Sequence, residues 1–301
     1  MRISKVKLTK IGELCSSIKY DGFFQYPTPF ILNGNIGVIY TNRVDNKSIP
    51  CYMVYSKDLA TQVVPPSNQL IPLGPPGTFY SQGIAIQWVS EKPHTKDDLH
   101  VSYYALGTGY TQGTDVPYRT QLLCTELSFT GNDFLFSKSI RREETSPEDL
   151  ISTCTPAVVR GELLYNSHTL WTKDSKGLDD PVYCVRDREI GPIFTSWDKA
   201  YTRPWECKIN SRDSIVIVSS RSVSYYRSGG PGSYRPEMYL SSFEVINSVK
   251  SLKKLDIEYC NEMIKEPMIA YGTTLEVDGN ILFFYNSSFD SRVCIALLEV
   301  E

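Results

Sequence analysis

One pattern recurs five times along the 301 residues, and it constrains the fold more than any other feature of the sequence. Each copy has a polar opening, often with a proline, then an apolar strand, a turn or loop, and a second strand that ends in polar residues. The copies span Tyr26–Arg43, Gly83–Leu106, Thr153–Trp171, Tyr201–Arg221 and Met268–Asn286. Turns such as Asn33-Gly34 and Asp278-Gly279 favour the positive φ angles of tight hairpins. The repeat therefore predicts a series of β-hairpins.

A third strand is predicted after each hairpin, at Pro50–Tyr55, Gln121–Leu127, Pro181–Val185, Glu237–Phe243 and Arg292–Leu298. Five meanders spaced along one chain are typical of a β-propeller, in which each meander is a blade around a central channel. We therefore predict an all-β, five-bladed propeller with an axial pocket, as one domain over residues 1–301. The alternative is a β-sandwich, which would not need the five-fold period. Val6–Ile11 is predicted to complete the last blade.

The composition supports a globular β protein and excludes some partners. Tyr, Phe and Trp make up 12% of the chain, with 20 Tyr, and strands favour such residues. The 31 basic and 34 acidic residues give a net charge of −3, which argues against a nucleic-acid partner, since phosphates require a basic surplus. No apolar run approaches about 18 residues, so no membrane span is expected. The chain opens with MRISKVKLTKIGELCSS, which lacks the apolar core of a secretory signal. These features predict a cytoplasmic protein.

The eight cysteines are at least 23 residues apart, so no CxxC or CxxH pair could chelate zinc. Reduced thiols inside strands are the simpler interpretation, with disulfides as the alternative in a secreted chain. Ser228–Tyr234 is glycine-rich but lacks the phosphate-binding P-loop pattern. No metal site and no cofactor are therefore predicted. Ser241–Leu255 has partly helical spacing and is either a short helix or a long connection between blades.

The first copy carries a family resemblance. Residues 24–46 read FQYPTPFILNGNIGVIYTNRVDN. They resemble the opening of bacterial five-bladed propeller proteins similar to arabinanase-like and invertase-like glycosidases, many of them predicted glycosidases linked to polysaccharide pathways. The family pattern has an aromatic residue or His, then Gln, an apolar residue and Pro, and its hairpin ends in Ser/Thr-Arg-Asp. Here these positions are Phe24 to Pro27 and Asn42-Arg43, with Asp45 displaced by one. The resemblance continues through Leu73–Phe79, Thr202–Pro204, Arg221 and Phe284–Asn286.

The resemblance implies carboxylates at the starts of the inner strands, where a pair of them serves as acid and as base or nucleophile. This chain departs from that pattern, because it reads Tyr80-Ser81-Gln82, Ser152–Cys154 and Thr202-Arg203 at such places. Glu266 is the carboxylate nearest to an inner-strand start, and Asp21 and Asp45 could lean toward the rim. The catalytic candidates are therefore Glu266, Asp21 and His168, and ordinary glycoside hydrolysis is expected to be weak or absent.

His168 ends the third outgoing strand. A histidine there could be a general acid or base, or a structural residue. Cys154 opens the same hairpin and could act as a nucleophile, although a buried structural cysteine is the commoner case.

Three arginines are the leading candidates for ligand binding. Arg43 and Arg221 end outgoing strands, and Arg203 starts an inner strand. If they converge they form an anion pocket, and the alternative is that each pairs with an acid such as Asp45 or Glu206.

The other candidates are amide and aromatic side chains. Gln25 and Gln82 could hydrogen-bond a ligand or bridge neighbouring blades. Tyr26 belongs to the family pattern. Tyr104, Tyr271 and Trp171 could stack on a ring or pack between blades.

The sequence leaves the activity open between three classes. The first is a glycosidase-like enzyme acting on a sugar or another polar, anionic metabolite. The second is a non-catalytic module that binds a ligand or stabilises a protein partner. The third is a propeller recruited to non-hydrolytic biosynthetic chemistry. A small molecule or a glycan is the expected ligand in each, with no nucleic acid and no membrane.

Overall fold

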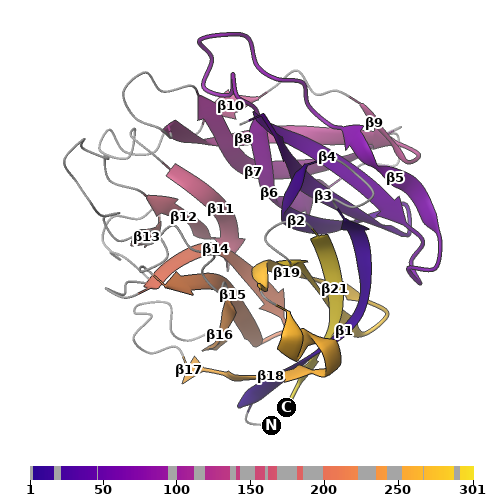
Figure 1. Cartoon of the computed structure of the whole chain (residues 1–301), viewed down its shortest axis with the longest axis vertical. Helices are drawn as coiled ribbons and strands as arrows, with labels where there is room; N and C mark the ends of the chain where they lie inside the picture. The colour runs from indigo at the N-terminus through magenta and orange to yellow at the C-terminus, as the bar shows by residue number, and fades with distance from the viewer. Residues whose placement is uncertain are drawn as a thin grey trace.

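The computed structural model describes residues 3–16, 22–45, 47–93, 100–111, 119–135, 140–142, 153–159, 162–167, 182–185, 199–222, 235–242, 253–266, 268–287 and 292–301. Its strands form five sheets (Figure 1). The first contains β2 (Phe23–Leu32), β3 (Asn35–Val44), β4 (Lys47–Tyr55) and β5 (Gln62–Gln69). The second contains β6 (Ile84–Glu91), β7 (Val101–Thr111), β8 (Arg119–Thr130), β9 (Asp133–Leu135) and β10 (Arg141–Arg142).

The remaining sheets follow the same meander order. The third contains β11 (Thr153–Val159), β12 (Glu162–Ser167) and β13 (Val182–Val185). The fourth contains β14 (Lys199–Lys208), β15 (Asp213–Ser222), β16 (Arg235–Ser242) and β17 (Lys253–Lys254). The last contains β19 (Ala270–Val277), β20 (Asn280–Ser287), β21 (Arg292–Val300), β1 (Lys5–Ser16) and β18 (Asp256–Cys260). A 3-10 helix, η3 (Asn261–Lys265), follows β18.

The innermost strands lie around a common centre. Contacts join β2 to β6, β6 to β11, β11 to β14, β14 to β19, and β19 back to β2, as Figure 1 shows at the middle of the molecule. The all-β propeller predicted from the repeat is thereby confirmed. Four sheets have the four or more strands of a complete blade, and the third sheet has three. The described residues thus show four complete blades instead of five equivalent ones, and residues 186–198 after β13 lie outside them.

The hairpin turns have the geometry that their residue types favour. Asn33 and Gly34 have φ angles of 49° and 77°, and Asp278 and Gly279 have 51° and 78°. Two successive positive φ angles define the primed turn whose twist matches the flanking strands. These turns fix the register of β2 on β3 and of β19 on β20, so the inner strands are positioned by local sequence.

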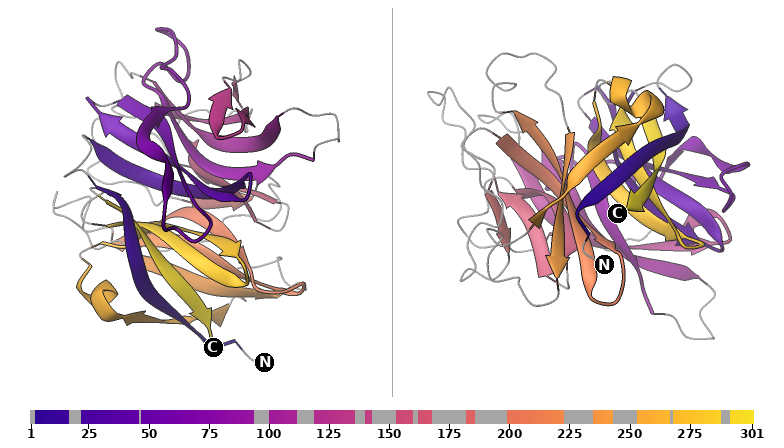
Figure 2. Two further views of the ribbon diagram at one scale, coloured as in Figure 1. Left: turned by 90° about the vertical axis from the view of Figure 1, so that its right-hand side faces the viewer. Right: turned by 90° about the horizontal axis from the view of Figure 1, so that it is seen from below.

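The two chain ends meet in one sheet. β1 pairs antiparallel with β21 from Val6↔Val300 onward, and it pairs parallel with β18 on its other side. Figure 2 shows the N- and C-termini close together at this edge of the molecule. The N-terminal strand therefore joins the sheet that the C-terminal strands build.

Each inner strand carries one β-bulge, where it has one residue more than its partner; the bulge is near the middle of the strand except in β19, where it follows the first residue. The bulges fall between Gln25 and Thr28, Ile86 and Trp88, Cys154 and Ala157, Thr202 and Trp205, and Ala270 and Thr273. A bulge bends the strand and redirects a side chain. Three of them contain a proline, which fits because proline cannot donate to a strand ladder. The bulges divide each inner strand into a first half and a second half.

The core fills the space between neighbouring sheets. Phe24, Phe30, Phe129 and Phe283 are buried there with aliphatic side chains from adjacent blades. Four cysteines are buried free thiols, namely Cys15, Cys51, Cys207 and Cys294. This agrees with the prediction that the cysteines are reduced and pack as small apolar residues. In the part of the chain that the structure describes, no helix is long and apolar enough to cross a membrane.

Candidate functional site

Five side chains gather on the axis at the ends where the inner strands begin. We call Tyr26, Arg43, Tyr110, Arg203 and Tyr271 the upper cluster. The rings of Tyr26 and Tyr271 are 4.5 Å apart between centroids. The guanidinium carbon of Arg203 lies 5.5 Å from the Tyr26 ring centroid, and that of Arg43 lies 5.1 Å from the Tyr110 ring centroid. The cluster therefore joins aromatic faces to two cations from different blades.

The bulges place three members of this cluster. Tyr26, Arg203 and Tyr271 follow the last regular pair before the bulge in β2, β14 and β19, and their φ angles are 57°, 53° and 55°. Non-glycine residues with positive φ carry strain of about 1–3 kcal/mol each, and such strain persists where the surrounding structure holds it. Three strained residues at equivalent positions around one axis mark this end of the propeller as a candidate site.

Arg203 spans from the fourth sheet to the first and second. Its Nη2 donates to the backbone oxygen of Pro27 at 2.8 Å, to Thr28 Oγ1 at 2.6 Å and to the backbone oxygen of Gln87 at 3.4 Å. The side chain is fully buried, and its Nε and Nη1 have no acceptor among the described residues. Burial lowers the pKa of Arg203 to about 9, against the opposing effect of Tyr26 and Tyr271. Arg203 is thus still a cation at neutral pH, with unused donors.

Arg43 approaches the same tyrosines from β3. Burial opposes its charge, but Tyr110, Tyr26 and Tyr271 outweigh burial, so the pKa of Arg43 lies above its usual value. Its Nε is also buried without a described acceptor. Besides burial, the groups that act on the pKa values of Arg43 and Arg203 are tyrosines, which are neutral phenols at pH 7, and no carboxylate of the described residues is among these groups. Two neighbouring cations without an offsetting acid favour a bound anion.

Polar side chains of the second strands hold the bulges of the next blade. Asn286 Oδ1 accepts from the backbone N–H of Tyr26 at 3.1 Å, and Asn286 Nδ2 donates to the backbone oxygen of Phe24. Ser219 Oγ accepts from the backbone N–H of Tyr271 at 2.6 Å. Asn286 and Ser219 occupy equivalent register positions, opposite Ala270 and Thr202. Neither residue was among the candidate site residues predicted from sequence, although the polar ends of the second strands, such as Asn286, were the available signal.

Glu266 does not lie in the upper cluster. Its carboxylate is 2.5 Å from Lys10 Nζ and accepts from Ser287 Oγ, while its backbone oxygen accepts from Arg235 Nη2 at 2.8 Å. Both Glu266 and Lys10 are largely buried. Burial lowers the pKa of Lys10, but the hydrogen bond to Glu266 and the electrostatic attraction of Cys294, Glu266 and Glu262 together outweigh burial, so the pKa lies above 10.5. Glu266 therefore ties the N-terminal strand to the last sheet.

Replacing Lys10 with methionine should lower the free energy of unfolding by about 1–3 kcal/mol, because Glu266 keeps its charge in a buried place without its cation. Since the pKa of Lys10 is raised in the folded protein, this contribution is complete below pH 10.5 and declines as pH rises through the folded value. Urea unfolding at several pH values measures both effects.

Lys7→Met is the matched control, because Lys7 forms a 3.6 Å pair with Glu299 on the exposed face of the same strand. Its effect should stay below about 1 kcal/mol. Equal effects of the two substitutions at neutral pH would contradict the structural role of Lys10.

The structure places the other described candidates at different distances from the upper cluster. Gln25 is half-buried directly before Tyr26. Gln82 is half-buried and lies beside Tyr110, because its backbone N–H donates to the backbone oxygen of Tyr110 at 2.9 Å. Tyr104 lies six residues before Tyr110 on β7, about 20 Å away along the strand, half-exposed with Lys92 5.4 Å from its ring centroid. The structure brings Gln25 and Gln82 near the cluster and leaves Tyr104 apart.

Several candidates fall outside the described residues, namely Asp21, His168 and Trp171, as do Ser228–Tyr234 and most of Ser241–Leu255. Arg221 has a described backbone position opposite Ala200, and its side chain lies outside the description, as does that of Cys154. In the part of the chain that can be searched, no cluster of three or more His, Cys, Asp or Glu could hold a metal ion.

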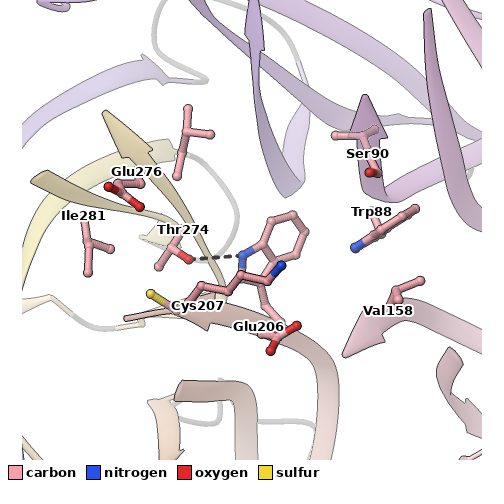
Figure 3. A pocket seen from close by; sticks show the side chains of 12 residues that line it. Trp88, Ser90, Val158, Glu206, Cys207, Thr274, Glu276 and Ile281 are labelled. Atoms are coloured by element: carbon pink, nitrogen blue, oxygen red, sulfur yellow. Dashed lines mark hydrogen bonds between the residues drawn. The ribbon is translucent and has the colours of Figure 1, made fainter. Parts of the chain in front are cut away.

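A cavity of about 390 Å³ lies on the axis beyond the bulges, and we call it the lower cavity. It is lined by the second halves of inner strands from several blades (Figure 3). The side chains that matter for its chemistry are Trp88, Trp205, Glu206, Lys208, Thr274 and Glu276. The axial pocket predicted from sequence was at the arginines, whereas this cavity is at the opposite end of the inner strands.

Comparisons with known proteins give fold relatives. No family model and no curated protein matches the chain. A putative glycoside hydrolase from Parabacteroides distasonis is 13% identical with a TM-score of 0.56, over 96% of this chain and 91% of that chain. A glycosyl hydrolase from Bacteroides ovatus is 9% identical with a TM-score of 0.57, over 98% and 94%. An α-L-arabinofuranosidase from Podospora anserina, solved with cellotriose, is 10% identical with a TM-score of 0.54, over 99% and 97%. The chain therefore shares the propeller fold of these glycoside hydrolases.

Proposed function

We propose that this chain is a glycosidase-like propeller whose upper cluster binds a sugar or another polar metabolite that carries an anionic group. The observation that carries the proposal is the approach of Arg43 and Arg203 to Tyr26 and Tyr271, with no offsetting carboxylate among the described residues. Arginine presents a planar fork of donors that matches a carboxylate, sulfate or phosphate. A ligand anion would supply acceptors to Arg43 Nε and to Arg203 Nε and Nη1, which have none among the described residues.

The aromatic members of the cluster support a ring-shaped ligand. Tyr26 and Tyr271 are tilted by 49° to one another and lie at the start of their strands, beside the half-buried Gln25. Aromatic faces combined with a few polar groups are typical of small-molecule sites. The names of the fold relatives are those of enzymes that act on glycosides, and one was solved with a cello-oligosaccharide. A sugar acid fits both the rings and the cations.

Hydrolysis of an ordinary glycoside is the less supported part of this function. The reaction needs two carboxyl groups about 5–9.5 Å apart across the scissile bond. Glu266, the best sequence candidate, is held by Lys10 and Ser287 in the last sheet. This pairing favours the alternative of a non-catalytic binding module, and we therefore propose that the upper cluster binds its ligand rather than hydrolysing it.

The proposal includes the organisation of the chain. We propose that the three-stranded sheet of β11, β12 and β13 is the fifth blade, because its inner strand closes the ring between β6 and β14. Residues 1–301 would then form one domain that works in the cytoplasm on a small molecule or glycan. Neither nucleic acid nor a membrane is required for this function, and a protein partner remains compatible with it.

Isothermal titration calorimetry with D-galacturonate, D-glucuronate, inorganic sulfate and neutral D-galactose tests the proposal. We expect a uronate to bind at least 10-fold more tightly than galactose, because a charged hydrogen-bonded contact is worth about 1.5–3 kcal/mol. Added salt should weaken the uronate. Under the same conditions, nitrophenyl glycosides should be turned over weakly or not at all.

Two results would overturn parts of this function. Equal affinity for galactose and the uronates would remove the anion-binding role of the arginines. Robust turnover of a nitrophenyl glycoside that Glu266→Gln abolishes would instead show that Glu266 is catalytic and that the carboxylate chemistry survives.

A further inference from the structure

We propose that the lower cavity is a second ligand site, separate from the upper cluster, and that it takes a neutral polyhydroxylated ring. The proposal goes beyond the anion site, because it concerns other residues at the other end of the inner strands. Its volume of about 390 Å³ lies within the range of about 300–1,000 Å³ typical of small-molecule sites.

A layer of buried polar contacts separates the two sites. Arg203 Nη2 crosses the axis to Thr28 and to the backbone oxygen of Gln87. Thr108 Oγ1 donates to Gln87 Oε1 at 2.7 Å, and both side chains are fully buried. The residues of the upper cluster on inner strands are at the bulges, whereas the lining residues of the lower cavity come after them. A ligand in the lower cavity therefore does not reach Tyr26 or Arg43.

Two indole side chains line the lower cavity. Trp88 is half-buried, and it lies across the space from Glu276 and Ile281 (Figure 3). Trp205 is held in place because its Nε1 donates to Thr274 Oγ1 at 3.2 Å, which the dashed line in Figure 3 marks. A half-buried tryptophan at a cavity wall offers an apolar face for a ring while keeping a polar edge. The orientation of the Trp205 indole is thus fixed in the absence of a ligand.

The charged groups of the cavity indicate a ligand rich in hydroxyl groups. Glu206 and Glu276 are acceptors, and Lys208 is a donor. Ser214 Oγ donates to Glu206 Oε1 at 2.6 Å, which orients that carboxylate. A hydroxyl group both donates and accepts, so it can satisfy both kinds of partner. An anion would meet two carboxylates, whereas the hydroxyl groups of a neutral ring can donate to both of them and accept from Lys208, so a neutral polyol ring uses all three charged groups.

Tryptophan fluorescence and calorimetry with three neutral probes test the proposal, namely cellotriose, methyl α-L-arabinofuranoside and methyl β-D-mannoside. We expect saturable binding of at least one probe. Trp88→Ala should weaken it by about 10-fold, the size of an aromatic contact. Glu206→Gln should weaken it several-fold, while Arg43→Ala should leave it unchanged. Phe23→Ala is the control, because it removes an exposed aromatic ring at the start of β2, a strand that does not line the lower cavity.

Three results would overturn the second site. The first is the absence of binding for all three probes to the wild-type protein. The second is binding that Trp88→Ala leaves intact in a protein with a normal melting temperature. The third is binding that Arg43→Ala removes, because the probes would then occupy the upper cluster. Uronate affinity, measured in parallel, reports separately on the anion site.

Discussion

Replacing Asn286 with alanine should lower the free energy of unfolding by about 2–5 kcal/mol, because a buried donor and a buried acceptor lose their partner together. Asn286 is fully buried, and its amide bonds both the backbone N–H of Tyr26 and the backbone oxygen of Phe24. These contacts join the last sheet to the first, where the propeller closes. Urea unfolding monitored by circular dichroism measures the loss.

Ser219→Ala is the matched control for this prediction. Ser219 occupies the equivalent position one blade earlier, and its Oγ accepts from the Tyr271 backbone N–H. Its loss leaves one buried donor unsatisfied, so a cost of about 1–3 kcal/mol is expected. If Asn286→Ala proved no more destabilising than Ser219→Ala, the closing role of the Asn286 amide would be refuted.

The hairpins could be predicted from sequence because their signal is local. Asn33-Gly34 and Asp278-Gly279 specify their turns through backbone preferences that do not depend on the rest of the chain. The antiparallel pairing of β2 with β3 and of β19 with β20 follows directly from these turns. The propeller followed from counting such units.

The site could be predicted only in part because it depends on contacts between blades. That Arg43 and Arg203 reach the same two tyrosines requires the strand bulges, which the sequence marked only as prolines near strand openings. Glu266 shows the same dependence on distant contacts. Its place near an inner strand predicted catalysis, which stays a prediction, and its partner Lys10 is 256 residues away in sequence. No spacing rule relates these two residues before the sheet closes.

The lower cavity was missed for a related physical reason. Trp88, Trp205 and Glu206 are in segments whose sequence pattern is that of ordinary buried β-strands. These residues come together only when the second halves of β6, β14 and β19 are placed around the axis. The sequence pattern favoured strand openings, where the polar residues are dense. The bulge in each inner strand redirects the chain after that point, so the two ends of the strands present different chemistry.

Replacing Arg43 with alanine should weaken uronate binding by about 30-fold or more, which corresponds to about 2–5 kcal/mol for losing one partner of a desolvated charge pair. Arg43 is suited to this test because it is only partly exposed, lies at the end of β3 and has no described carboxylate among the groups that shift its pKa. Arg203 is a poorer choice, since its three hydrogen bonds also join sheets.

The control for charge is Arg212→Ala, because Arg212 is an exposed cation in the turn between β14 and β15. It should change uronate affinity less than about 2-fold, since an exposed distant charge acts only through a screened field. Arg43→Lys should recover only part of the lost affinity, because an ammonium cannot make the planar two-point contact of a guanidinium. Full affinity in a normally folded Arg43→Ala protein would exclude the upper cluster as the anion site, and a full rescue by lysine would reduce its role to charge alone.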